Sequence, residues 1–180
     1  MDDTCRDISV TCIAPTKTFN LAGLQTAAVY AENSILHHRM WRQLNTDEVA
    51  EPNAFAIQAT IAAFQYGEEW LDELREYVEK NKQYVTEFLQ EKIPLIHPVA
   101  GEATYLMWLD CRKITESGRQ FAKFIRKTSG LYVSGGNQYG RGGEGFLRVN
   151  VATSKLVVED GMQRLYESVD AWLKEEKISK

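Results

Sequence analysis

An amphipathic run in the middle of the chain limits the folds that this sequence can adopt. Its apolar residues recur at helical spacing, with charged residues between them: Leu71, Leu74, Tyr77, Val78, Val85, Phe88 and Leu89. This spacing predicts one long helix that buries a single stripe, and Pro94 lies beyond its end. After Pro98 the pattern changes to short β-rich segments. We therefore expect a long helix that leads into a separate α+β unit.

The C-terminal part of the sequence predicts three strands and two helices on one face. The expected strands are residues 104–110 (TYLMWLD), 131–134 (LYVS) and 146–151 (FLRVNV). A short helix is expected over 118–127, and Ser154 is placed to cap a second one. The apolar residues of that last helix form one stripe: Val158, Met162, Leu165, Val169 and Trp172.

The N-terminal part has a less regular pattern. The β-branched run Ile8–Ile13 predicts a buried strand that Pro15 ends. Residues 21–32 are small and apolar, and their pattern does not decide between strand and helix. A short amphipathic helix is expected over 35–44. An Ala-rich segment over 54–66 is apolar on most faces, which predicts a buried helix.

Charge and hydropathy exclude several classes of partner. The chain has 180 residues and a net charge of −4, which gives no electrostatic reason to bind nucleic acid or an anionic membrane. No apolar run is long enough to span a bilayer, and the N-terminus lacks the pattern of a signal peptide. We therefore expect a cytoplasmic protein with neither nucleic acid nor membrane as a partner.

Cysteine and histidine spacing gives no metal-binding pattern. The three cysteines are scattered: Cys5, Cys12 and Cys111. Without a C-x-x-C pair, zinc or dithiol chemistry is not expected, and reduced thiols suit a cytoplasmic protein. His37 and His38 are adjacent and would diverge on a helix, while His97 is isolated. We expect no metal site.

Lys17 is the first candidate for chemistry. It follows the predicted strand and Pro15, and a lysine that is partly desolvated there can attack a carbonyl group. The alternative is an ordinary solvated turn residue. Residues 14–25 (APTKTFNLAGLQ) resemble the signature around the lysine that binds pyridoxal 5′-phosphate (PLP) in fold-type I enzymes of the aminotransferase superfamily. That resemblance implies that Lys17 carries PLP as a Schiff base and that Thr16 also contacts the cofactor.

Two details of this segment distinguish branches of the family. The pair Phe19-Asn20 after the lysine is most similar to the cystathionine β-lyases and C-S lyases of the MalY/PatB type. In many aminotransferases an arginine eight positions after the lysine binds the cofactor phosphate, and this sequence has Gln25 there. A neutral amide is a weaker phosphate partner than a guanidinium. The resemblance therefore favours a lyase over an aminotransferase.

Arg148 is the second candidate. Strand alternation places it on one face with Phe146 and Asn150, while Leu147 and Val149 take the other face. Its planar fork suits an α-carboxylate, although a structural ion pair with an acidic residue is an alternative. Residues 145–152 (GFLRVNVA) resemble the segment in which the family's arginine binds the substrate carboxylate, which implies this role for Arg148.

The glycine-rich loop before that strand contains Tyr139. Residues 134–140 (SGGNQYG) resemble the family's G-x-x-Y-G loop near the substrate entrance, which implies that Tyr139 contacts substrate. The loop lacks the pattern of a phosphate-binding P-loop. The alternative is a long hairpin connection whose glycines allow positive φ.

The resemblance extends from about residue 7 to residue 176 and implies a fold class. We expect the C-terminal part of the PLP-dependent transferase fold, an α/β fold whose small α+β domain has a three-stranded, mainly antiparallel sheet covered by helices. The expected division is a large-domain remnant over 1–52, inter-domain helices over 53–97 and the small domain over 98–180.

Only 16 residues precede Lys17, too few for the phosphate turn, the stacking aromatic and the aspartate of the family's cofactor site. We therefore expect a fragment that is inactive alone and binds PLP weakly or not at all. The parent enzyme is expected to be a homodimer that releases pyruvate, ammonia and a thiol from a sulfur amino acid. Alternatives are a class I/II aminotransferase and a non-catalytic α+β interaction domain in which Lys17 is incidental.

Overall fold

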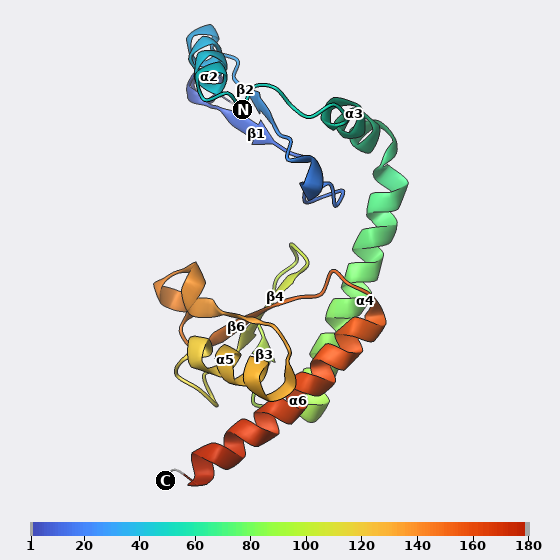
Figure 1. Ribbon diagram of the computed structural model, residues 1–180, viewed down its shortest axis with the longest axis vertical. Coiled ribbons are helices and arrows are strands. Elements are labelled where there is room, and N and C mark those ends of the chain that lie inside the picture. The colour runs from blue at the N-terminus through green and yellow to red at the C-terminus, as the bar shows by residue number, and fades with distance from the viewer. Residues whose placement is uncertain (1, 179–180) are drawn as a thin grey trace. The chain divides into compact units, whose positions relative to one another are not determined.

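The computed structural model describes residues 2–178, which form two compact units divided between Leu74 and Arg75. Figure 1 shows the elements coloured from blue at the N-terminus to red at the C-terminus. The predicted three-part division into domains stays a prediction.

The N-terminal unit contains short elements and the beginning of a long helix. These are α1 (Asp3–Ile8), β1 (Thr11–Ile13), the 3-10 turn η1 (Ala22–Leu24), β2 (Ala28–Tyr30), α2 (Ser34–Thr46), α3 (Ala56–Tyr66) and the first turns of α4 (Glu68–Lys92). Strands β1 and β2 pair antiparallel, with Thr11 opposite Tyr30 and Ile13 opposite Ala28. The expected short helix over 35–44 is confirmed by α2, which Asn33 caps by accepting from the amide nitrogens of Ile35 and Leu36.

The prediction of a buried strand over Ile8–Ile13 is wrong in two respects. Asp2 accepts a hydrogen bond from the Thr4 amide and starts α1, so Ile8 ends a helix rather than beginning a strand. All residues of β1 are exposed, and Ile13 keeps 50% of its surface. Within the described residues β1 pairs with β2 alone, so this two-stranded sheet leaves its apolar side chains exposed.

Helix α3 is present as predicted, but its expected burial is wrong. Only Ala56 of this helix is buried, and four of its large side chains are exposed: Ile57, Ile61, Phe64 and Tyr66. An apolar pattern shows which side chains favour burial, and it does not supply the layer that covers them. Helix α3 of the N-terminal unit therefore presents exposed apolar side chains.

The C-terminal unit contains a four-stranded sheet and three helices. Besides the rest of α4, its elements are β3 (His97–Pro98), β4 (Leu106–Asp110), α5 (Gly118–Ser129), β5 (Ser134–Gly135), the 3-10 turns η2 (Gly136–Tyr139) and η3 (Arg141–Gly143), β6 (Phe146–Asn150) and α6 (Lys155–Ile178). The strands are antiparallel in the order β3-β4-β6-β5. The predicted number of three strands is therefore wrong by one. Strand β3 has only two residues, one of them a proline at the sheet edge, and this is too short for any alternation to show.

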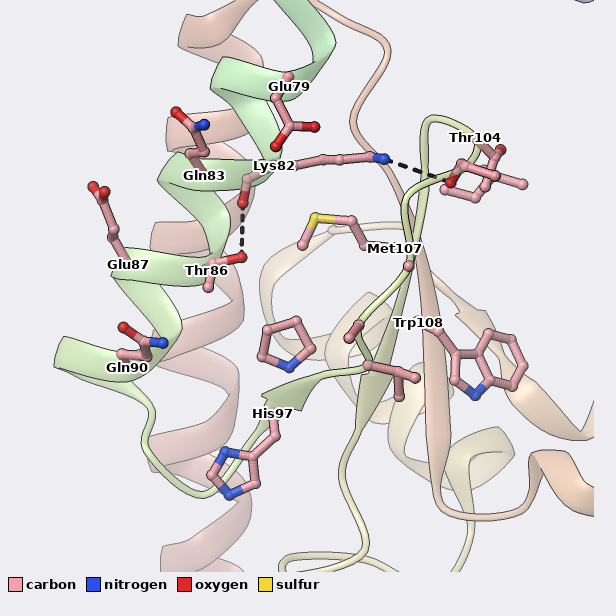
Figure 2. Close-up of a pocket in the computed structure, with 16 residues that line it drawn as sticks. Glu79, Lys82, Gln83, Thr86, Glu87, Gln90, His97, Thr104, Met107 and Trp108 are labelled. Carbon is pink, nitrogen blue, oxygen red and sulfur yellow. Dashed lines mark hydrogen bonds between the residues drawn. The ribbon is translucent and has the colours of Figure 1, made fainter.

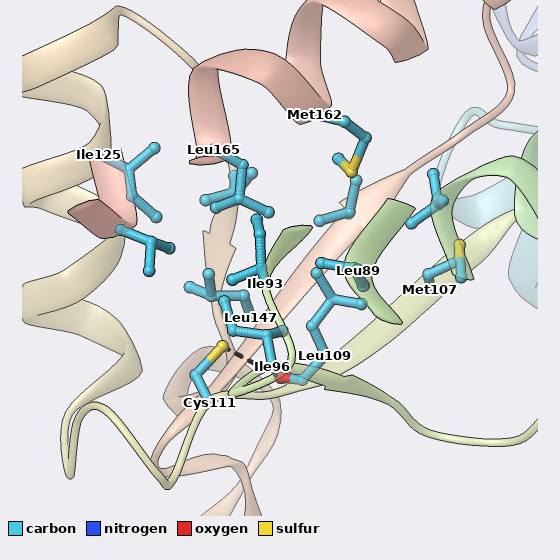
Figure 3. Packing of buried hydrophobic residues seen from close by; sticks show 14 of the residues in the cluster. Leu89, Ile93, Ile96, Met107, Leu109, Cys111, Ile125, Leu147, Met162 and Leu165 are labelled. Carbon is cyan, nitrogen blue, oxygen red and sulfur yellow. Dashed lines mark hydrogen bonds between the residues drawn. The ribbon is translucent and has the colours of Figure 1, made fainter. Parts of the chain in front are cut away.

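One face of this sheet forms the core (Figure 3). Alternation buries Met107 and Leu109 of β4, and Leu147 and Val149 of β6. The helices add Val85 and Leu89 from α4, Phe121 and Ile125 from α5, and Val158, Met162, Leu165 and Val169 from α6. The expected stripe on the last helix is confirmed. The sequence predicts two covering helices, and the C-terminal half of α4 is a third because its apolar stripe enters the same core.

A buried amide joins α4 to the segment that follows β6. Asn81 is only 2% exposed, and its Nδ2 donates to the carbonyl oxygens of Val151 at 2.9 Å and Thr153 at 3.0 Å. These carbonyl groups lie beyond the last ladder position of β6, so Asn81 satisfies acceptors that the sheet leaves unpaired. The contact fixes the end of the strand that carries Arg148.

Candidate functional site

Lys17 lies in a tight turn after β1. The Phe19 amide donates to the Pro15 carbonyl at 2.9 Å, and the Leu21 amide donates to the Thr16 carbonyl at 3.0 Å. Asn20 closes the turn in the left-handed region, with a φ of 55°. Pro15 is buried and Thr16 half-buried, whereas Lys17 is exposed. The backbone of this turn is therefore fixed while the amine of Lys17 remains accessible.

Gln25 follows the same segment and ends η1. Its backbone adopts the left-handed conformation with a φ of 47°, and its amide nitrogen donates to the Ala22 carbonyl at 3.1 Å. It lines a hollow of about 760 Å³ in the N-terminal unit, between residues 24–29 and the apolar side chains of Ile57 and Ile61. Among the described residues that line this hollow, Glu51 is the only charged one. The described lining therefore offers no cationic side chain to a phosphate.

Arg148 lies on the face of the sheet opposite the core, as strand alternation predicts. In the antiparallel ladders it pairs with Trp108 of β4 and with Ser134 of β5. Its neighbours Leu147 and Val149 are buried, while Arg148 itself is half-buried. The predicted assignment of faces on this strand is confirmed.

A stack of aromatic rings and guanidinium groups covers this face, and we call it the Arg148 stack. The guanidinium carbon of Arg148 lies 4.3 Å from the centroid of the Tyr139 ring. Tyr139 meets Trp108 edge-on with 5.7 Å between centroids, and Trp108 stacks on Phe146 at 5.6 Å. Arg112 ends the stack, 4.9 Å above the Phe146 ring. The structure thus brings together Arg148 and Tyr139, the two residues for which the sequence predicts substrate contact.

The guanidinium of Arg148 makes no ion pair and no hydrogen bond with any residue whose side chain the structure describes. Asp110 lies on the same sheet face, but its Oδ1 and Oδ2 accept from Nε and an Nη of Arg112 at 2.9 Å and 2.6 Å. The hydrogen bonds from Arg112 hold the pKa of Asp110 below its ordinary value. The structure therefore does not support the alternative of a structural ion pair for Arg148, and its donors are available to an external anion.

Sequence reasoning placed Phe146 on the same strand face as Arg148, but it missed Trp108 and Arg112 as neighbours of the candidate site. The signal was present for Trp108, because strand alternation sets it opposite the core-facing residues of β4. Arg112 follows the end of β4, and no strand or helix pattern indicates that its side chain lies above a ring. Lys17 and Thr16 belong to the other unit, so they form a separate part of the candidate site.

The C-terminal unit also has a groove, whose side chains form no group comparable to the Arg148 stack. It has a volume of about 640 Å³ and lies between α4 and the β3–β4 segment, as Figure 2 shows. Lys82 reaches across it to the Ala103 carbonyl at 3.5 Å, between the acidic residues Glu79 and Glu87.

Within the described residues there is no group of three potential metal ligands. Among the helices of the described residues, none is long and apolar enough to cross a membrane.

Comparison with known proteins identifies the class. The family model for aminotransferases of class I and II matches residues 6–165, which is most of the chain. The chain belongs to this family, as the motifs around Lys17 and Arg148 predict. The family's enzymes are lyases and aminotransferases whose cofactor is PLP, and the predicted fold class is confirmed.

Among curated proteins, the chain is 37% identical over 165 residues to the cystathionine beta-lyase PatB of Bacillus subtilis. It is 30% identical over 156 residues to the protein MalY of Escherichia coli. These matches cover 92% and 86% of the chain but only 43% and 40% of the two relatives. The chain thus spans less than half the length of the curated relatives that it matches.

Solved structures agree with this placement. A PLP-bound putative aminotransferase from Clostridium difficile superposes with a TM-score of 0.89 at 28% identity, and 93% of the chain covers 43% of it. Cystalysin from Treponema denticola, which contains PLP, superposes with a TM-score of 0.89 at 25% identity, and the match covers 94% and 43% of the two chains. The described residues are thus similar to a part of these enzymes.

The chain offers a partner for the aldehyde group of PLP, but the hollow beside Gln25 offers no cationic partner for its phosphate group. Lys17 offers an exposed primary amine, which is the group that bonds to an aldehyde. The hollow beside Gln25 offers a carboxylate rather than cationic groups to a phosphate. That PLP binds weakly, if at all, to this chain alone stays a prediction.

Proposed function

We propose that this chain is the C-terminal part of a PLP-dependent C-S β-lyase that acts on sulfur amino acids, and that it is inactive alone. The observation that carries the proposal is the half-buried guanidinium of Arg148, which lies on the Tyr139 ring and makes no hydrogen bond or ion pair with the described side chains. A cation held in this way is suited to bind the α-carboxylate of an amino acid.

Each candidate residue has a role in this proposal. Lys17 holds the cofactor through its ε-amine and then moves the proton of the substrate Cα, and Thr16 supports the cofactor beside it. Arg148 binds the α-carboxylate through both arms of its fork, and Tyr139 fixes the plane of that fork. When bound, PLP supplies the electron sink for negative charge at Cα. Loss of a thiol from Cβ, followed by hydrolysis with one molecule of water, then yields pyruvate and ammonia.

The alternative function is that of a class I/II aminotransferase. The likeness to the C. difficile putative aminotransferase supports it. Gln25 supports the lyase, because the neutral amide stands where many aminotransferases have an arginine for the cofactor phosphate. The 37% identity to PatB points in the same direction. A non-catalytic interaction domain would require that Lys17 have no special reactivity.

We further propose that the complete protein is a cytoplasmic homodimer. The free thiols Cys5, Cys12 and Cys111 suit a reducing compartment. The exposed apolar side chains of β1 and α3 require covering protein, and a part of the fold beyond this chain together with a second subunit would provide it.

The test has two stages. In the first, the 180-residue chain is incubated with PLP, reduced with borohydride and digested, and mass spectrometry locates the modified lysine. We expect the adduct at Lys17, its absence in Lys17→Ala and its retention in the control Lys113→Ala. If the adduct is spread evenly over all lysines, the interaction-domain alternative is favoured.

In the second stage, the chain is joined to the part of PatB that precedes the matched region. We expect pyruvate release from cystathionine by the joined protein and none by the chain alone. Transfer of the amino group to a keto acid without pyruvate release would replace the lyase with the aminotransferase. Size-exclusion chromatography with light scattering on the joined protein tests the homodimer.

A further inference from the structure

The Phe19 side chain connects the turn around Lys17 to the junction of α3 and α4. Its ring meets Phe64 of α3 edge-on with 5.6 Å between centroids and lies 6.2 Å from the ring of Trp70 in α4. Phe19 is half-buried by these contacts, although Phe64 and Trp70 are themselves exposed in part. The ring thus occupies a defined seat on the two helices.

The seat exists because residue 67 is a glycine. A Cβ atom built on Gly67 would lie 2.6 Å from Cε1 and 3.0 Å from Cδ1 of Phe19, and 2.4 Å from the Ala63 carbonyl oxygen. The backbone of Gly67 has a φ of −89° and a ψ of 4°, which residues with side chains also adopt. The glycine is therefore required for space and not for its conformational freedom.

The anchored ring and the reactive amine belong to the same turn. Phe19 is two residues after Lys17, and its own amide closes the turn by donating to the Pro15 carbonyl at 2.9 Å. Pro15, which precedes Lys17 by two residues, is buried. The turn is thus held on both sides, by Pro15 and by the seated Phe19 ring.

We propose that Phe19, seated on Gly67, is a positioning residue for Lys17. The seat holds the Lys17 turn closed, so that the ε-amine starts from a fixed backbone when it attacks a carbonyl. This inference rests on the proposed function for the role of Lys17, while the anchoring of the turn can be measured without any cofactor. Removing the ring should both loosen the turn and slow the reaction of this one lysine.

The experiment uses the full 180-residue chain and two readouts. The first is hydrogen–deuterium exchange of the Phe19 and Leu21 amides, which close the turn. The second is the rate of borohydride trapping of PLP on Lys17, divided by the rate on the lysines of residues 75–180. The test variants are Phe19→Leu and Gly67→Ala, and Phe19→Tyr is the variant that keeps the ring.

Matched controls make the same chemical changes elsewhere. Phe55→Leu alters a ring that is 75% exposed, and Gly101→Ala adds a Cβ that meets nothing within 4 Å. The amides of α3 report whether a variant still folds. If Gly67→Ala disrupts α3, the comparison of Phe19→Leu with Phe19→Tyr still decides the question, because neither changes the helix.

Ring contacts of this kind correspond to about a twofold to tenfold change in an equilibrium. We expect Phe19→Leu and Gly67→Ala to speed exchange of both turn amides by that factor and to slow relative trapping on Lys17, while Phe19→Tyr behaves like the unchanged chain. Equal exchange and trapping in Phe19→Leu and Phe55→Leu would overturn the inference. A third result would separate the two proposals: the turn amides exchange faster in Phe19→Leu, but the unchanged chain shows no preferential trapping of PLP on Lys17. That result would support the anchoring of the turn and contradict the proposed function.

Discussion

The guanidinium of Arg148 lies over the ring of Tyr139, with 4.3 Å between the guanidinium carbon and the ring centroid. The two residues come from different elements: Tyr139 lies in η2, within the glycine-rich loop, and Arg148 lies in β6, the strand that follows it. A ring below the guanidinium attracts the cation through its face and leaves the in-plane donors free. The pair therefore presents a planar fork of donors from a fixed position, which is the arrangement that a carboxylate requires.

The proposed role of Arg148 predicts a loss of substrate binding when its fork is removed. In the chain joined to the preceding part of PatB, Arg148→Lys keeps the charge and loses the bidentate geometry. We expect kcat/KM to fall roughly 30- to 1,000-fold, with most of the change in KM, because the carboxylate is bound equally before and during the reaction. Steady-state pyruvate release measures both constants.

The matched control is Arg126→Lys, because Arg126 lies over the Tyr132 ring at 5.1 Å in a similar pair away from the Arg148 stack. It should leave both constants unchanged. Equal effects of the two substitutions would show that Arg148 acts only as a structural cation.

Tyr139 is predicted to act through its ring rather than its hydroxyl group. Tyr139→Phe should retain activity, whereas Tyr139→Leu should raise KM about twofold to thirtyfold, the range of a cation–π contact. The same change at Tyr132, which faces Arg126, should have no effect on KM. If Tyr139→Phe is as defective as Tyr139→Leu, the hydroxyl group and not the ring is the required part.

The sequence predicted the C-terminal unit better than the N-terminal unit for a physical reason. The faces of β6 and the stripe from Val158 to Val169 follow from alternation and helical spacing, since the layers that bury them lie within the same 106 residues. For Ile13 and Ile61 the pattern indicates burial, yet both remain about half exposed in this unit. A periodic pattern specifies which face is apolar, and the partner that covers it must come from elsewhere.

The candidate site divides in a similar way. Lys17 and Arg148 could be found because the motifs around them are local in sequence. The contact between Arg112 and Phe146 could not be found in this way, because it forms only after β4 and β6 have paired. The seat of Phe19 on Gly67 joins positions 48 residues apart, and no spacing rule predicts it.

The buried amide of Asn81 is predicted to stabilise the C-terminal unit. Asn81→Ala leaves the carbonyl oxygens of Val151 and Thr153 without their donor, and an unsatisfied buried polar group costs about 1–3 kcal/mol. Urea unfolding followed by circular dichroism should show a lower midpoint with an unchanged slope. Gln163→Ala, which removes an exposed amide bonded to Glu167, should shift the free energy of unfolding by less than about 0.5 kcal/mol. A shift for Asn81→Ala as small as this would show that water replaces its hydrogen bonds.

The three thiols are predicted to differ in reactivity because only Cys111 is buried. Burial, and secondarily the negative charge of Asp110, raise the pKa of the Cys111 thiol to about 12, whereas Cys5 and Cys12 are exposed. A thiol reacts as its thiolate, so a colorimetric disulfide reagent at pH 8 should modify two thiols in the folded chain and three in denaturant.

The same pKa shift predicts how stability depends on pH. The folded state disfavours the thiolate, so its contribution is complete below the unfolded pKa of about 8.5 and falls as the pH rises from there towards 12. Cys111→Ser keeps a neutral polar group and should remove this part of the decline between pH 8.5 and 10, as measured by urea midpoints. Rapid modification of a third thiol in the folded chain at pH 8 would show that β4 opens at its end, and in that case Cys111→Ser should leave the pH dependence unchanged.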